Sequence, residues 1–190
     1  SASSTRPHQP PHTWHSHATA PHREASTQYN ATIKVAHRTE ALRLLEEMRQ
    51  KGFPPNVLNY NCAINRCAKG GKWQCALDLL EEMQRCGLVP NEITYGSVID
   101  ACAKGGESQR ALNLLDEMRS RGLVLDKITC SSVIHACARV GESQRAIDLL
   151  DEMRSRGLVL GVALVCSVVH HWALHRVSPR ALNTLGAVLS

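Results

Sequence analysis

Aromatic residues, metal-binding cysteine motifs and long apolar runs are scarce in this chain of 190 residues. Phe, Trp and Tyr make up only 4% of it, which suits a core of Leu, Ala, Val, Cys and Met packed between helices. No CxxC pair occurs, so the ligands of a structural zinc or of a zinc-dependent deaminase are missing. No nucleophile and base occur together in a catalytic pattern. We therefore predict no catalytic residues, no metal and no cofactor.

What the chain does contain is an internal repeat. Residues 107–125 and 142–160 lie 35 residues apart and differ only at Leu112/Ile147 and Asn113/Asp148. Alanine, methionine and glycine recur at the same spacing, at Ala41, Ala76, Ala111, Ala146 and Ala181, at Met48, Met83, Met118 and Met153, and at Gly52, Gly87, Gly122 and Gly157. A fixed period of 20 to 50 residues indicates stacked structural repeats.

Each repeat unit is expected to form two helices. In the clearest copy, one apolar stripe at helical spacing comprises Tyr95, Val98, Ile99 and Cys102, and a second comprises Ala111, Leu114, Leu115 and Met118. Gly105 and Gly106 should end the first helix, Ser108 should cap the second, and Gly122 should end it. A lone helix pair cannot bury both stripes, so the units must stack into a superhelix.

We expect three well-formed units at 57–91, 92–126 and 127–161. A degenerate unit at 22–56 precedes them, and a partial unit at 162–190 follows, so the array covers 24–190. The apolar run LVLGVALVCSVV at 158–169 is too short to span a bilayer, which needs about 20 apolar residues. It fits the repeat register as the first helix of a buried unit, and we expect no contact with a membrane.

Residues 1–23 are rich in Ser, Thr, Pro and His and contain no acidic residue. Such a segment cannot form a core and should be disordered. It is interpreted most simply as a linker; an organellar targeting remnant and a His-rich metal-binding tract are the alternatives.

Three of the eight cysteines, Cys67, Cys102 and Cys137, share one place in successive units. We expect them to be reduced core residues, which favours a reducing compartment. The net charge of +5 permits nucleic-acid binding without demonstrating it.

The 35-residue period, the YNCAI and TYGSVI helix starts, the CAKGG turns, the ALDLLEEM and ALNLLDEM second helices and the GLVPN ending resemble the pentatricopeptide repeat family. The resemblance covers about 22–190 and is strongest over 57–161. It implies an all-α fold, a right-handed α-solenoid of stacked antiparallel helix-turn-helix repeats. It also implies binding of single-stranded RNA, one base per unit, along a concave surface lined by the first helices.

In this family two residues of each unit read the base edge, one near the start of the first helix and one that closes the unit. The resemblance assigns these roles to Asn61 with Asn91, Gly96 with Asp126, and Ser131 with Gly161. Asn61 with Asn91 implies a pyrimidine, more often C than U, whereas Gly96 and Gly161 depart from the family pattern. In the degenerate unit, Ser26 with Asn56 would imply A.

Two further sets follow from the same resemblance. Apolar residues that would sandwich the bases are Leu58, Ile93 and Ile128. Basic residues that would face the RNA backbone are Lys69, Lys104 and Arg139. A solvated helix terminus explains the basic residues equally well, because cations are favourable there.

Acidic pairs recur on the second helices, at Glu46–Glu47, Glu81–Glu82, Asp116–Glu117 and Asp151–Glu152. We expect a solvated outer face with local ion pairs there, rather than catalytic carboxylates. His170, His171 and His175 could share one helix face, but no repeat copies them and we predict no metal site.

The sequence thus predicts an RNA-binding module without enzymatic activity, used in mitochondrial or plastid RNA processing, stability, editing or translation. The alternative is an α-solenoid scaffold for protein–protein interaction without RNA specificity. Self-association through the partial C-terminal unit is a further expectation.

Overall fold

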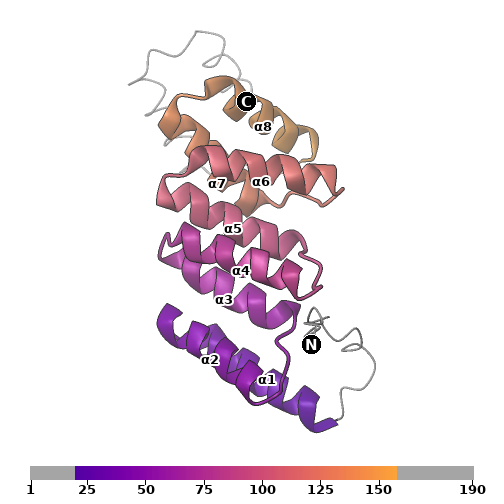
Figure 1. Cartoon of the computed structure of the whole chain (residues 1–190). Helices are drawn as coiled ribbons and strands as arrows, with labels where there is room; N and C mark the ends of the chain where they lie inside the picture. Colours follow the sequence, from indigo (N-terminus) through magenta and orange to yellow (C-terminus); the bar gives the residue numbers. More distant parts are fainter. Residues whose placement is uncertain (1–19, 158–190) are drawn as a thin grey trace, which may run out of the picture.

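The computed structural model describes residues 20–157 as four helix pairs and no strand (Figure 1). The pairs are α1 (Ala20–Val35) with α2 (Arg38–Gln50), α3 (Val57–Lys69) with α4 (Trp73–Arg85), α5 (Glu92–Gly105) with α6 (Ser108–Ser120), and α7 (Lys127–Val140) with α8 (Ser143–Ser155). From α3 onward, the helices of successive pairs start 35 residues apart. The predicted all-α solenoid of helix-turn-helix units is confirmed.

Glycines end the helices as the sequence predicts. Gly106 follows α5 with φ of +87° and Gly122 follows α6 with φ of +71°, in the left-handed region that side chains disfavour. Beyond Gly122, the amide of Leu123 donates to the carbonyl of Met118 (3.1 Å), closing the helix end in the usual glycine-dependent way.

The predicted cap at Ser108 is wrong. Glu107 takes the cap position of α6, and Ser108 is the first residue of that helix. The Ser108 hydroxyl is buried and donates to the carbonyl of Ala136 on α7 (3.1 Å). Sequence patterns near a helix start could not reveal this contact, since its partner lies in the next unit.

Both predicted apolar stripes form the core. Tyr95, Val98, Ile99 and Cys102 are fully buried on α5, and the repeated alanines and methionines of the second helices are fully buried as well. Cys67, Cys102 and Cys137 are also buried, and every described cysteine is a free thiol.

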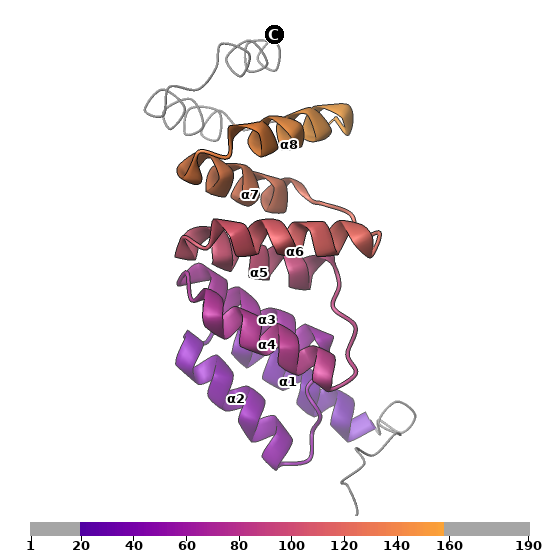
Figure 2. The same ribbon diagram turned by 45° about the horizontal axis from the view of Figure 1, so that its top comes forward.

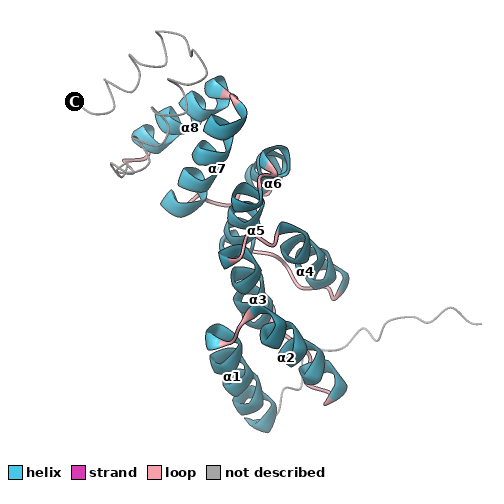
Figure 3. Cartoon of the chain, turned by 90° about the vertical axis from the view of Figure 1, so that its left-hand side faces the viewer, coloured by secondary structure: helices cyan, strands magenta, loops and turns pink. Residues whose placement is uncertain are grey.

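The first helices pack directly against one another along the array, α1 on α3, α3 on α5 and α5 on α7. Each of the second helices α2, α4 and α6 packs against the first helix of its own unit and of the next (Figure 2). Figure 3 shows α1, α3, α5 and α7 following one another, with α2 and α4 set to one side. The first helices therefore make a continuous layer.

The degenerate first unit contains both helices. Its first helix, α1, begins at Ala20, inside the segment 1–23 for which we predict disorder; residues 1–19 lie outside the described range. The partial unit 162–190, the run at 158–169 and the three C-terminal histidines also lie outside it. Across the described helices, none combines the length and apolar character needed to cross a membrane.

Candidate nucleic-acid interface

The residues that close the units cap the next first helix. Asn56, Asn91 and Asp126 precede α3, α5 and α7, and each side chain accepts a hydrogen bond from the backbone amide three residues on, at 3.0, 3.1 and 2.7 Å. Asn and Asp are preferred at this position because their side-chain oxygens satisfy amides that the helix leaves unpaired. The proposed reading residues Asn91 and Asp126 thus have a structural role that the family comparison alone does not show.

The structure brings one complete predicted reading pair together. Nδ2 of Asn61, on α3, donates to Oδ1 of Asn91 at 3.3 Å. Asn61 is only 6% exposed, and its own Oδ1 accepts a hydrogen bond from the Thr94 hydroxyl at 2.6 Å. In the first unit the equivalent residues also meet, because Nδ2 of Asn56 donates to Oγ of Ser26 at 2.9 Å. The 35-residue register therefore extends into the degenerate unit.

The second predicted pair, Gly96 with Asp126, makes no side-chain contact, and of the third pair only Ser131 lies within the described residues. Gly96 has no side chain, and the place a Cβ would occupy lies 2.6 Å from Oγ1 of Thr129, so the neighbouring threonine occupies this space. Ser131 donates to the carbonyl of Lys127, one turn back on its own helix (2.7 Å). Gly161 lies outside the described residues.

The three residues predicted to contact bases by stacking are exposed. Leu58, Ile93 and Ile128 are 56%, 64% and 69% exposed, and each is the second residue of a first helix. A single exposed aliphatic residue needs no explanation, but the same residue class exposed at the same place in three consecutive units forms a regular apolar row.

The predicted backbone-binding cations are also exposed, in the last turns of α3, α5 and α7. Their local partners differ. Lys104 forms an ion pair with Asp100 (2.6 Å), and Arg139 donates to the carbonyl of Ala103 (3.3 Å). Lys69 makes no ion pair with any described residue. Exposed pairs of this kind stabilise the fold little, so phosphates can compete for these cations.

Charge is divided unequally between the two sets of helices. In the described part of the chain, the first helices carry seven Lys or Arg and three Asp or Glu residues, whereas the second helices carry eight and eleven. The first-helix layer is therefore basic and the second-helix layer acidic, which directs a polyanion to the first helices.

The repeated carboxylates only partly match the expected solvated face. The first members of the pairs, Glu46, Glu81, Asp116 and Asp151, are exposed. The second members are half-buried: Glu82 and Glu117 accept hydrogen bonds from the buried tyrosines Tyr60 (3.0 Å) and Tyr95 (2.7 Å). Burial raises the pKa of both tyrosines to about 12, which keeps their hydroxyls protonated as donors. These carboxylates hold the helix pairs together.

Successive second helices are joined by arginine. Arg49 of α2 pairs with Glu82 of α4, and Arg119 of α6 pairs with Glu152 of α8. This arrangement gives the acidic layer a structural role.

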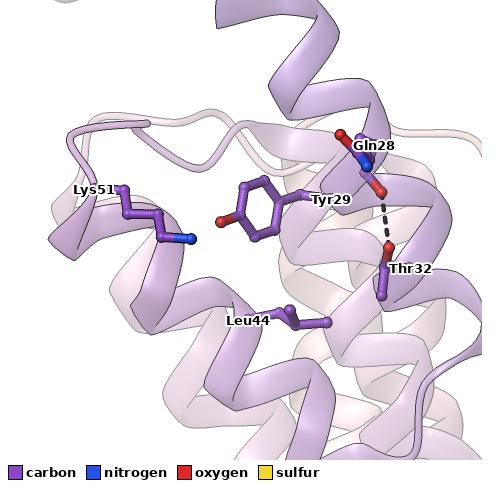
Figure 4. A pocket seen from close by; sticks show the side chains of 5 residues that line it. All are labelled: Gln28, Tyr29, Thr32, Leu44 and Lys51. Carbon is purple, nitrogen blue, oxygen red and sulfur yellow. Dashed lines mark hydrogen bonds between the residues drawn. The ribbon is translucent and has the colours of Figure 1, made fainter.

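A shallow depression of about 280 Å³ lies between α1 and α2 (Figure 4). It is lined by Gln28, Tyr29, Thr32, Leu44 and Lys51. The Tyr29 hydroxyl donates to Glu47 (2.9 Å), so its polar group is already paired. No cluster of potential metal ligands occurs among residues 20–157. The depression therefore does not compete with the first-helix layer as a candidate site.

One close pair of cysteines was not predicted from the sequence. Sγ of Cys67, on α3, lies 2.7 Å from Sγ of Cys75, on α4. The hydrogen bond from the Cys67 thiol and the positive charge of Arg38 hold the pKa of Cys75 below its usual value. The positions equivalent to Cys75 in the next two units are Arg110 and Arg145. This break in the repeat was the sequence signal for the cysteine pair.

These features define a helix-pair repeat protein whose layer of first helices is basic and carries a row of exposed aliphatic residues. Three family models match it: the pentatricopeptide repeat domain at 28–70, the PPR repeat family at 55–104 and 97–139, and the PPR repeat at 128–158. The chain belongs to the pentatricopeptide repeat family. No curated protein matches the chain.

Among solved structures, the fold is similar to the PPR domain of Arabidopsis thaliana protein-only RNase P 1 in complex with tRNA, with a TM-score of 0.72 and 17% identity over 90% of this chain and 88% of that one. It is also similar to the pentatricopeptide repeat protein PPR10 from maize, with a TM-score of 0.55 and 29% identity over 84% of this chain. PPR10 in complex with an 18-nt psaJ RNA element has a TM-score of 0.64 and 19% identity over 86% of this chain. The chain spans only 24% of the latter structure's length.

Proposed function

We propose that the chain binds single-stranded RNA along its first helices, about one base per unit. The observation that carries the proposal is the combination, on α3, α5 and α7, of an exposed aliphatic residue in the first turn and an exposed cation in the last. Apolar side chains can pack on base faces while cations contact phosphates. Two of the similar structures contain RNA, an 18-nt element and a tRNA.

Base recognition is proposed to be uneven along the array. Asn61 with Asn91 forms a paired reading site, and Ser26 with Asn56 repeats this geometry one unit earlier. Unit 92–126 lacks a reading side chain at Gly96 and would bind its base by stacking, and Ser131 with Gly161 remains the proposed pair of unit 127–161. We propose no chemistry on the RNA, and a role in mitochondrial or plastid RNA processing, stability, editing or translation.

The test is a binding series with short single-stranded RNAs at increasing salt. In the variant Lys69→Glu/Lys104→Glu/Arg139→Glu, affinity at low salt should fall roughly tenfold or more, because three phosphate-facing cations become repulsive. The matched control reverses three arginines on second helices, Arg43, Arg85 and Arg154, and changes the net charge equally. Equal losses in both variants, or no binding by the folded wild type, would refute the proposal.

The second candidate is a scaffold for protein–protein interaction. Its partners would include a second copy of the chain. It is favoured by Gly96, which leaves one unit without a reading side chain, and by the local partners that already engage Lys104 and Arg139. Specific capture of a protein by a chain that binds no RNA would support it.

A further inference from the structure

The reading pair of unit 57–91 is held by a residue of the next unit. Thr94, on α5, is fully buried. Its hydroxyl accepts a hydrogen bond from the Asn91 backbone amide (3.2 Å) and donates one to Oδ1 of Asn61 (2.6 Å). Oδ1 of Asn91 also lies 3.0 Å from this hydroxyl, but this contact is longer than the 2.6 Å contact with Oδ1 of Asn61.

This network determines which way the Asn61 amide faces. Oδ1 of Asn91 accepts the backbone amide of Thr94 (3.1 Å), so the Asn61 atom beside it has to be the donor Nδ2. The carbonyl oxygen of Asn61 then points to the Thr94 hydroxyl. Both side-chain carbonyl oxygens accept hydrogen bonds from within the protein, whereas one N–H of Asn61 and both of Asn91 have no partner among the described residues.

We infer that Thr94 is a positioning residue for base selection: it orients Asn61 so that the pair offers only hydrogen-bond donors to a base. The inference rests on the proposed RNA binding. Two neighbouring donors match a base edge with two neighbouring acceptors. Cytosine has such an edge in N3 and O2, whereas the N3–H of uracil interrupts its two carbonyls. Without the Thr94 hydroxyl, only the longer 3.3 Å contact with Asn91 would hold the Asn61 amide in this orientation.

The neighbouring units provide controls inside the same chain. Thr129 occupies the place of Thr94 one period later, but it faces Gly96, which has no amide to orient. Asn59 occupies this place one period earlier, and its Nδ2 donates to Asn30 (2.5 Å) rather than to Ser26. Among the units that the structure describes, the hydroxyl-to-amide contact therefore occurs only at the reading pair Asn61 with Asn91.

The experiment selects from a pool of randomised eight-nucleotide single-stranded RNAs, and then measures affinities for the enriched RNA and for its C-to-U variant. Wild type should enrich one cytosine. Thr94→Val, which removes the hydroxyl and keeps the shape, should reduce the C-over-U ratio on the order of fivefold, about the effect of one hydrogen bond. Thr94→Ser and Thr129→Val should keep the ratio. An unchanged ratio in Thr94→Val, or an equal loss in Thr129→Val, would overturn the inference.

Because Thr94→Val could fail to fold, wild type supplies a second measurement. In NMR spectra one Nδ2 proton of Asn61 should exchange slowly and the other should shift when the cytosine-containing RNA binds. RNA binding that moves neither proton overturns the role of Thr94 but not RNA binding itself. A folded wild type that enriches no RNA overturns the proposed function as well.

Discussion

At the scale of single residues, Asn91 has two tasks with different chemical requirements. Capping α5 uses its side-chain oxygen, whereas the proposed base contact uses its side-chain N–H groups. Asp126 shows that a carboxylate caps the next first helix equally well, since it accepts the Thr129 amide at 2.7 Å.

Asn91→Asp should therefore separate the two tasks. The free energy of unfolding should change little, because the cap oxygen remains, whereas Asn91→Ala should lose roughly 1 kcal/mol as caps do. Both variants should lose the preference for cytosine, since both lack the N–H donors. Chemical denaturation and RNA affinities measure the two effects. A cytosine preference retained in Asn91→Asp would contradict the reading role.

Cys75 should be unusually reactive among the half-buried and buried thiols. Its pKa is lowered by Cys67 and Arg38, while burial raises the pKa of Cys102 and Cys137 to about 11. The thiolate is the reactive form, and its fraction increases as pH rises through the pKa. Iodoacetamide at pH 7, followed by peptide mass spectrometry, should label Cys75 well before Cys102 or Cys137. Equal rates for these three would contradict this assignment.

At the scale of helices, neighbouring units interlock at one turn. Trp73, at the start of α4, lies against Gly105 at the end of α5, and the Arg110 guanidinium lies 4.8 Å from the Trp73 ring. A Cβ at Gly105 would lie 2.4 Å from Cδ1 of Trp73 and 3.0 Å from the carbonyl oxygen of Gly71. The turn between α3 and α4 therefore requires glycine on the neighbouring helix.

Gly105→Ala should lower the free energy of unfolding by about 1–3 kcal/mol, because Trp73 or the whole of α5 must shift. Gly70→Ala is the matched control one period earlier. The nearest atom to a Cβ there is 3.6 Å away, and φ is −96°, so alanine is compatible. Thermal and urea unfolding measure both variants, and equal stability of the two would refute the interlock.

At the scale of the whole molecule, the 35-residue period was enough to predict four helix pairs and their stacking. It works because each unit buries the same stripes, such as Ala111 and Met118, against equivalent neighbours. The family resemblance, rather than the period, predicted Leu58, Ile93 and Ile128 as base-contacting residues, and their side chains are exposed.

Side-chain contacts between helices could not be predicted from the sequence. The Thr94–Asn61 bond, the Ser108–Ala136 bond and the Cys67–Cys75 contact each join different helices, and no local pattern encodes the distance between them. The caps at Asn91 and Asp126 are different, because each joins residues only three apart. An Asn or Asp directly before an apolar stripe was the sequence signal for them.

The most direct measurement is an NMR titration of the isotope-labelled protein with short single-stranded RNA, followed by backbone amide shifts. RNA binding along the first helices predicts shift changes near Leu58, Asn61 and Lys69 on α3, with equivalent changes on α5 and α7, that shrink as salt increases. The second helices α4 and α6 should change little. Shifts concentrated on those helices, or none at low salt, would contradict RNA binding along the first helices.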